Sequence, residues 1–299
     1  MDKAAGKSPL KNNVFDTALL FEGGGMRASY TSAITAKLLS EGVYFDYVAG
    51  ISAGSSNAVN YLSRDIGRTR TSFVDFAEDP NFGGMHTFLQ GKGYFSAAYI
   101  YEETCLPGNA LPYDFETYAR NSARLRIGAV RQASGEMRWF GREDANTMQR
   151  LLRIVRASSS VPFWMPPVTI EGEKYVDGGV IRGLPLHIAL QDGYQRFFVV
   201  LTRPKGYRKS AQPLLFLSLP AVGPYAGLLE SYRHSFQHYN DDLDALEELE
   251  KQGKAYLVYA EDMLVEGDEM NVAKLRENYA RGERQADRQW PEWRDFIYR

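Results

Sequence analysis

Residues 17–54 read TALLFEGGGMRASYTSAITAKLLSEGVYFDYVAGISAG, and this stretch decides the fold. Residues 17–21 form a short apolar run that stops at glycines, which is typical of a buried strand. Residues 27–41 then carry apolar side chains at helical spacing, and Gly42 is well placed to end that helix. A second apolar run at 47–51 leads into another helical pattern. The order strand, helix, strand, helix predicts a βαβ unit whose parallel strands are joined by a right-handed crossover.

The sequence beyond this unit continues to alternate strand and helix patterns. We expect an aromatic-rich insertion of helices and loops over 72–120, and a charged helical extension over 261–299 that packs on the main domain of residues 14–260. The other predicted elements are a strand pair at 124–130 and 136–140, a helix at 146–158, a hairpin at 168–180, a strand at 197–201, a helix at 239–252 and a strand at 255–259. These elements predict a three-layer α/β/α sandwich with a mainly parallel central sheet.

The composition argues against several classes of function. The chain has 299 residues, of which 44% are hydrophobic, so it is long enough to bury a large core. Its 35 basic and 37 acidic residues give a net charge of −2, so no global field favours nucleic acid. The one cysteine, Cys105, excludes an internal disulfide and suits a reducing compartment. It lies in a loop-like stretch without a neighbouring base, which argues against a cysteine nucleophile.

The sequence gives no sign of export or of a membrane span. Residues 1–13 are polar, without the apolar run of a signal peptide or the Met-Gly start of a myristoylation site. The longest uncharged apolar stretch, 213–229, is broken by prolines and glycines and is shorter than the ~20 residues of a spanning helix. We expect a cytoplasmic protein that contacts a membrane surface transiently. Four basic residues beside that stretch could meet lipid, although a solvated loop is the simpler interpretation: Arg203, Lys205, Arg208 and Lys209.

The motif Gly50-Ile51-Ser52-Ala53-Gly54 has the spacing of a nucleophile elbow. A strand precedes it and a helix follows, which is the context that such a motif requires. The helix N-terminus behind Ser52 would favour developing negative charge. The competing interpretation is that Gly50 and Gly54 only let the strand and helix pack closely. We predict that Ser52 is a nucleophile.

Upstream, Gly23-Gly24-Gly25 precedes a helix and exposes backbone amides to an anion, either an oxyanion or a phosphate. Residues 23–28 also match the dinucleotide fingerprint, but its acidic partner should end the second strand, and Asp46 precedes that strand. A non-catalytic lipid- or nucleotide-phosphate-binding protein is therefore the alternative function. Only one helix and one strand separate the glycines from Ser52, so both lie where adjacent parallel strands end. That spacing argues against an ordinary α/β-hydrolase.

A serine nucleophile needs a base, and none of the four histidines has a special setting: His86, His187, His234 and His238. The last two are four residues apart, as metal ligands can be, but no third ligand is evident and we expect no metal. Asp177 ends a predicted strand and is followed by Gly178 and Gly179, which would let another backbone approach. Burial would have to raise its pKa from about 3.9. Taken alone, this Asp-Gly-Gly motif also fits a simple turn.

Together these motifs resemble the patatin-like phospholipase family, in particular its bacterial cytoplasmic members. The resemblance covers EGGGMR at 22–27, GISAGS at 50–55, RASSSVPFWMPPV at 156–168 and YVDGGV at 175–180. The family commonly has Asp where this chain has Glu22, and Gly where it has Ala28. Because the predicted helix has already begun at Ala28, we expect that change to be tolerated.

The resemblance implies a serine acyl hydrolase of lipid esters that uses a Ser–Asp dyad without histidine and without a cofactor. Ser52 would be the nucleophile, Asp177 the base, and Gly23, Gly24 and Gly25, with Arg27 nearby, the oxyanion hole. Hydrolysis would proceed by two-step acyl transfer. The insertion 72–120 could line an acyl pocket or form a lid, or it could be a second packing layer over the sheet.

Overall fold

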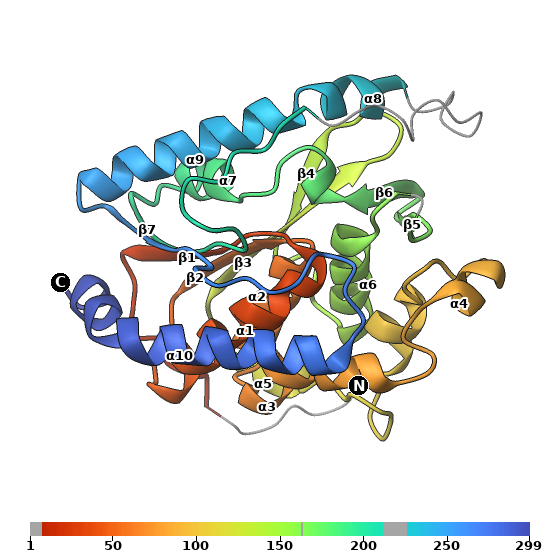
Figure 1. The fold of residues 1–299 in the computed structure, drawn as a ribbon, viewed down its shortest axis with the longest axis horizontal. Coiled ribbons are helices and arrows are strands. Elements are labelled where there is room, and N and C mark those ends of the chain that lie inside the picture. Colours follow the sequence, from red (N-terminus) through yellow and green to blue (C-terminus); the bar gives the residue numbers. More distant parts are fainter. Residues whose placement is uncertain (1–7, 163, 212–225) are drawn as a thin grey trace.

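The computed structural model describes residues 8–162, 164–211 and 226–299. In the described chain an eight-stranded sheet has the order β5-β6-β3-β2-β1-β7-β8, with β4 paired to β3. Helices cover both of its faces (Figure 1), which confirms the predicted three-layer α/β/α architecture. The strands are β1 Thr17–Phe21, β2 Tyr47–Ile51, β3 Arg124–Arg131, β4 Met137–Phe140, β5 Val168–Ile170, β6 Glu173–Asp177, β7 Arg196–Val200 and β8 Ala255–Val258.

The βαβ unit that decides the fold is present where the sequence predicts it. Strands β1 and β2 pair in parallel, with Leu19 opposite Val48 and Phe21 opposite Gly50. Both strands are buried along their whole length, because helices cover the two faces of the sheet. The helix between them, α1 (Ala28–Ser40), follows a short 3-10 turn, η1 (Gly25–Arg27).

Two hydrophobic cores hold the layers together. One lies between the sheet and α1, α2, α6 and α10, and contains Phe45, Phe198 and Trp293. The other lies between the opposite face and α7 and α9, and contains Phe197 and Leu246. The remaining bounds are α2 Ala53–Leu62, α3 Ile66–Thr71, η2 Asp75–Glu78, α4 Met85–Leu89, η3 Tyr99–Glu103, α5 Phe115–Arg120, α6 Met148–Ser159, η4 Gly178–Val180, α7 Leu186–Gln191, α8 Ala226–Arg233, α9 Ser235–Lys251 and α10 Val272–Ile297.

Strands β3, β2, β1, β7 and β8 are neighbours in this order and run parallel to one another. Strands β4 and β6 pair antiparallel with β3, and β5 pairs antiparallel with β6. Strand β3 pairs with β2 up to Gly128, which is opposite Ile51. Its next residue, Ala129, is opposite Asp177 of β6. Strand β6 therefore meets β3 where the pairing with β2 stops, and this register brings Asp177 to the end of β2.

The segment 72–120 consists of short elements, whereas the segment 261–299 contains one long helix that packs on α1. Residues 72–120 contain short helical elements and no named strand, and most of them lie around the lower right of Figure 1. Helix α10 packs along α1, where a Cβ on Gly282 would come within 2.5 Å of the Tyr30 carbonyl oxygen. The Asn278 amide also donates to the Ser29 hydroxyl at 2.8 Å. The C-terminal helix thus rests on the helix that follows the glycine loop.

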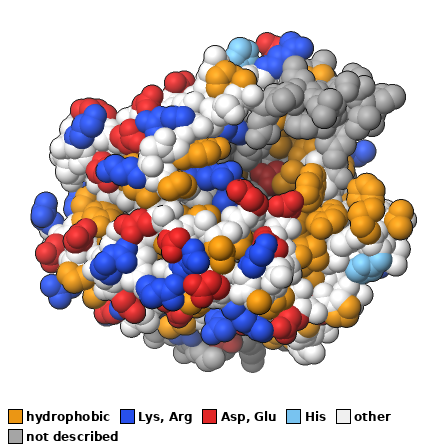
Figure 2. All heavy atoms as spheres, in the orientation of Figure 1, with side chains coloured by type: hydrophobic (Ala, Val, Ile, Leu, Met, Phe, Trp, Pro, Cys, Tyr) orange, Lys and Arg blue, Asp and Glu red, His pale blue; other side chains and the backbone are white. Residues whose placement is uncertain are grey.

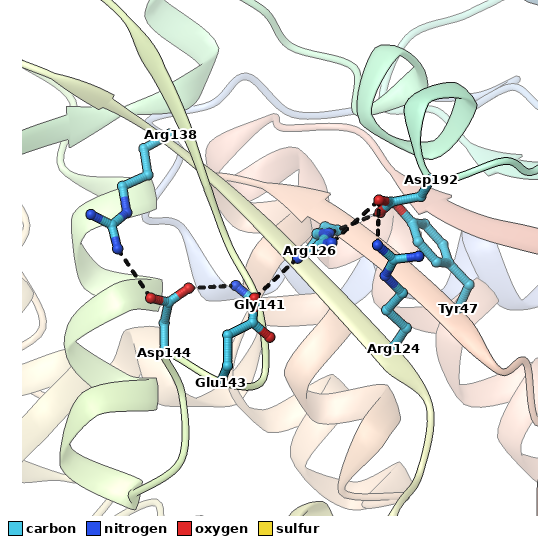
Figure 3. A network of polar contacts seen from close by, with 8 residues as sticks. All are labelled: Tyr47, Arg124, Arg126, Arg138, Gly141, Glu143, Asp144 and Asp192. Atoms are coloured by element: carbon cyan, nitrogen blue, oxygen red, sulfur yellow. Dashed lines mark hydrogen bonds and ion pairs between the residues drawn. The ribbon is translucent and has the colours of Figure 1, made fainter.

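A polar network connects the end of α7 to the first residues of β2 and β3, at the edge of the sheet away from Ser52 (Figure 3). Asp192, just after α7, accepts hydrogen bonds from the Tyr47 hydroxyl at 2.9 Å and from Arg126 Nε at 2.8 Å. Arg124 also pairs with it. Burial alone would raise the pKa of Asp192, but the bonds from Arg126 and Tyr47 outweigh it and lower that pKa. Tyr47 and Arg124 begin their strands, so this network is structural and distant from Ser52.

Candidate active site

Ser52 lies in a strained turn between β2 and α2. Its backbone has φ 56° and ψ −129°, a left-handed conformation that is rare for a residue with a side chain. Ser52 is the residue immediately before α2, so it lies at the positive end of that helix. It is 8% exposed. The turn has the backbone strain and the strand–helix position expected of a nucleophile elbow.

The two flanking glycines are required by close packing. A Cβ on Gly50 would lie 2.3 Å from the Gly54 carbonyl oxygen, and one on Gly54 would lie 2.4 Å from that of Phe21. Both distances are far shorter than atoms tolerate. Close packing and the elbow are therefore the same feature, because the sharp turn at Ser52 exists only where strand and helix approach this closely.

Ser158, on α6, supports the elbow from outside the motif. Its hydroxyl accepts a hydrogen bond from the Ser52 amide at 2.9 Å and donates to the Gly128 carbonyl at 2.6 Å. Ser158 is fully buried. It links the end of β2 to β3 and fixes the backbone of Ser52. Sequence reasoning did not single it out, because one serine among three at 158–160 gives no directional signal.

Asp177 ends β6 and faces Ser52. The Ser52 hydroxyl donates to Asp177 Oδ2 at 2.5 Å, and the Gly179 amide donates to Oδ1 at 2.6 Å. Gly178 passes β3 so closely that a Cβ there would lie 2.6 Å from the Gly128 carbonyl oxygen. Burial raises the pKa of Asp177 to about 6, against the opposing hydrogen bonds from Ser52 and Gly179. A carboxylate with this pKa can accept a proton near neutral pH.

The glycine loop passes beside Ser52. A Cβ on Gly23 would lie 3.2 Å from the Ser52 Cβ. The Gly23 amide already donates to the Gly183 carbonyl at 3.2 Å, which lies on the segment after Asp177. Within the described chain, the amides of Gly24 and Gly25 have no such acceptor. Of the three predicted oxyanion donors, Gly24 and Gly25 are therefore the ones with free N–H groups.

A buried carboxyl group anchors the start of this loop. Glu22 accepts hydrogen bonds from the Thr202 amide at 2.5 Å and from the Tyr239 hydroxyl at 2.9 Å. Burial raises the pKa of Glu22, with both bonds acting in the opposite direction. The Thr202 hydroxyl also donates to the Gly23 carbonyl at 3.0 Å. Glu22 thus joins the ends of β1 and β7 to α9, and the longer side chain in place of aspartate reaches both donors.

Ser52 and Asp177 line a cavity of about 940 Å³. Gly24, Gly25 and Arg27 line it too, so the cavity contains every predicted catalytic and oxyanion group. Part of its wall comes from the 72–120 insertion, including Phe73, Phe82, Phe95, Tyr101, Leu111 and Tyr113. The insertion therefore contributes an apolar wall to the site, in addition to packing over the fold.

The histidines lie elsewhere. All four are among the described residues, and none of them lines the cavity. His234 Nδ1 is 2.9 Å from Gln237 Oε1, and burial lowers the pKa of His238. In the described chain, no three His, Cys, Asp or Glu side chains are grouped as a metal ion would require. The group beside Ser52 that can accept its proton is Asp177.

Comparison with known proteins identifies the family. The model of the patatin-like phospholipases matches residues 19–190, which is more than half of the chain. The chain belongs to the patatin-like phospholipase family. Its region 19–190 includes the glycine loop, the elbow and the Asp-Gly-Gly motif. A second model, a domain of unknown function named DUF6363, matches residues 225–298 and so includes α9, β8 and α10.

Two other proteins are similar to this patatin-like chain. The uncharacterized protein YjjU of Escherichia coli K12 is 27% identical over 192 residues, which are 62% of this chain and 52% of that protein. The chain thus matches about half the length of this curated relative. The crystal structure of VipD from Legionella pneumophila aligns with a TM-score of 0.48 at 12% identity, over 91% of this chain and 67% of that one.

None of the helices in the described part of the chain has the length and hydropathy of a bilayer-spanning segment.

Proposed function

We propose that this patatin-like protein is a serine hydrolase that cleaves fatty-acyl esters of phospholipids or related lipids through Ser52 and Asp177. One observation carries the proposal: the hydroxyl of an elbow serine donates to a buried carboxylate inside a large, partly apolar cavity. Membership of the family supports the reaction class. The apolar wall supports a substrate with a hydrocarbon chain.

The proposed reaction has two steps. Asp177 accepts the Ser52 proton as the hydroxyl oxygen attacks the ester carbonyl, and the amides of Gly24 and Gly25 stabilise the resulting oxyanion. Collapse breaks the bond to the alcohol, which leaves with the proton from Asp177. Water then attacks the acyl-enzyme while Asp177 accepts its proton. When the second oxyanion collapses, Ser52 regains a proton and the fatty acid leaves.

Contact with a lipid surface is a further part of the proposal. Helix α4 exposes three large apolar side chains, and Leu89 is 80% exposed; the others are Met85 and Phe88. The loop after α4 is tied to the cavity rim, because the Tyr94 amide donates to the Trp164 carbonyl at 2.7 Å and Trp164 lines the cavity. Exposed apolar side chains on an element that is linked in this way to a lipid site support partitioning into a membrane surface.

A fluorophosphonate probe tests the reaction class, because it labels only an activated serine. We expect labelling at Ser52, and its loss in Ser52→Ala and Asp177→Asn. Alanine variants of His86, His187, His234 and His238 should keep both labelling and ester hydrolysis. A folded wild-type protein that resists labelling, yet binds lipid or phosphate, would establish the non-catalytic alternative. If one histidine variant is inactive while Asp177→Asn is active, the dyad is wrong.

A further inference from the structure

Three cations line the cavity on the side of the glycine loop. Arg27 follows the loop in η1, while Arg203 and Lys209 lie on the segment after β7. Figure 2 shows this face hollowed, with charged side chains of both signs along one side of the hollow and hydrophobic side chains along the other. A fourth cation of the lining, Arg68, donates to Asn60 and to the carbonyls of Leu111 and Pro112 on the side of the insertion. The cations that are not engaged in this way lie on the side of the glycine loop.

Arg27 and Arg203 share one acceptor. Arg27 Nη1 is 3.2 Å from Glu266 Oε2, and Arg203 Nη1 is 3.6 Å from the same oxygen. The Glu266 side chain is 74% exposed, so it is free to move away at small cost. Arg27 Nε is buried and has no hydrogen-bond partner within the described chain. A buried donor without a partner favours a ligand that can accept its proton.

Lys209 is held in place by its backbone. Its amide donates to Asn240 Oδ1 at 2.9 Å, and its carbonyl accepts from the Asn240 amide at 3.0 Å. No ion pair or hydrogen bond engages its amine among the residues that the structure describes. Burial lowers the pKa of Lys209, while the charges of Asp177 and Glu22 oppose that effect. A partly buried lysine whose amine has open donors therefore lines the cavity.

The carboxylates of the cavity leave hydrogen-bond donors of these three cations without an acceptor among the described residues. Glu22 and Asp177 each accept two hydrogen bonds from other groups. Glu266 and Asp268 are exposed side chains of the connection to α10. Within the part of the chain that the structure describes, Ser56, Ser159 and Gln132 each leave a side-chain oxygen unpaired in the lining, but the charged groups left open there are donors with positive charge. Such a set fits a compact anion with several acceptor oxygens, such as a phosphate.

We propose that Arg27, Arg203 and Lys209 form a subsite for a phosphate carried on the alcohol side of the ester, and that Glu266 competes for it. The orientation rests on the proposed function: the acyl chain lies against the apolar wall, so the alcohol lies toward the cations. The charged side then makes the enzyme prefer phosphate-bearing esters over neutral esters of the same acid.

Binding to Ser52→Ala tests the subsite without requiring hydrolysis. Calorimetry with hexyl phosphate should give a dissociation constant about tenfold weaker in Ser52→Ala/Lys209→Gln and Ser52→Ala/Arg203→Gln, since each loses a charge-assisted bond. Ser52→Ala/Lys209→Arg should restore most of the affinity. The matched control is Ser52→Ala/Lys205→Gln, because Lys205 is on the same segment but exposed and outside the cavity lining. Glu266→Gln should tighten binding several-fold.

Kinetics in the otherwise wild-type enzyme test the orientation. We expect the ratio of kcat/KM for a phosphate-bearing ester to that for a neutral ester of the same acid to fall about tenfold in Arg203→Gln and Lys209→Gln. Lys205→Gln should leave this ratio unchanged. If the wild-type protein hydrolyses none of the esters, the proposed function and the orientation of the substrate are both wrong. The binding result would still decide whether the anion subsite exists.

Three outcomes overturn the subsite. In the first, hexyl phosphate binds equally well to the parent and to both cavity variants. In the second, Lys205→Gln weakens binding as much as they do. In the third, inorganic phosphate binds as tightly as hexyl phosphate, which makes the site one for free phosphate and not for lipid. Thermal melting of each variant checks that a loss of binding is not a loss of fold.

Discussion

The Ser52 hydroxyl donates to Asp177 Oδ2 at 2.5 Å, and the carboxylate that accepts it is 3% exposed. The other oxygen, Oδ1, is fixed by the Gly179 amide, so the carboxylate cannot turn away from the serine. In the proposed mechanism, burial is what makes this aspartate a usable base. An exposed aspartate, with a pKa near 3.9, would hold a proton too weakly for efficient transfer at neutral pH.

Activity should fall as the pH drops through the pKa of Asp177. In the proposed mechanism Asp177 accepts a proton only when it is ionised, and burial raises its pKa to about 6. We therefore expect kcat/KM for a neutral, soluble ester to rise tenfold per pH unit below about 6 and to level off above it. Initial rates between pH 4.5 and 8.5 measure this. An acid limb near pH 4, with the fold intact, would contradict the assignment.

Asp177→Asn should make the protein more stable at neutral pH while making it inactive. A group whose folded pKa is raised binds more protons in the native state, so its stabilising contribution is greatest at low pH and is lost as the pH rises through about 6. The buried carboxylate costs up to about 3 kcal/mol above that pH. The gain in Tm of Asp177→Asn over wild type should be large at pH 7.5 and small at pH 4. A gain that does not depend on pH would exclude this cause.

Gly54→Ala should strongly destabilise the fold and abolish activity. Its Cβ would lie 2.4 Å from the Phe21 carbonyl oxygen, so β1 and α2 would have to separate. Overpacking of this kind costs about 1–3 kcal/mol or more. Gly67→Ala is the matched control, because its nearest neighbour would be Asp65 Oδ1 at 3.5 Å and it lies within α3. There, helix propensity predicts a gain of about 0.5–1 kcal/mol. Urea denaturation of both variants measures the difference.

Phe88→Ser with Leu89→Ser should reduce hydrolysis of lipid in vesicles by about tenfold and leave a soluble ester unaffected. The two substitutions remove about 3 kcal/mol of transfer free energy, part of which is realised at a membrane surface. Leu190→Ser is the control, because Leu190 is 45% exposed and lies on α7, on another face. Vesicle flotation measures binding directly. If Leu190→Ser loses as much vesicle hydrolysis, or if the double variant binds vesicles as well as wild type does, then α4 is not the membrane contact.

Much of the fold could be predicted because its signals are local. The runs at 17–21 and 47–51 coincide with β1 and β2, and Gly42, with φ 69°, follows the end of α1. The predicted hairpin at 168–180 is also present, and Glu171 and Gly172 form its turn with positive φ between β5 and β6. Buried parallel strands and glycine stops depend on the chain's own geometry, which the sequence carries directly.

The parts that the sequence did not reveal depend on contacts between distant segments. Nothing in the pattern around Gly23 shows that its amide is already bonded to Gly183. Likewise, a run of basic residues looks solvated, yet Arg203 and Lys209 line the cavity while Lys205 does not. Apolar residues of α4 resemble core residues in sequence, and only the packed structure leaves them exposed. Side-chain direction in loops is set by tertiary packing, which local periodicity does not encode.

The register of β3 has a consequence for how the molecule folds. Ser52 and Asp177 are 125 residues apart, and they meet only when β6 pairs with β3 beyond Gly128. Closing so long a loop carries a large entropic cost, so this pairing should follow the local assembly of β1, α1 and β2. In a refolding experiment, helical circular dichroism should therefore recover first, and ester hydrolysis only later. The time course of regained activity would then report when the β5–β6 hairpin pairs with β3.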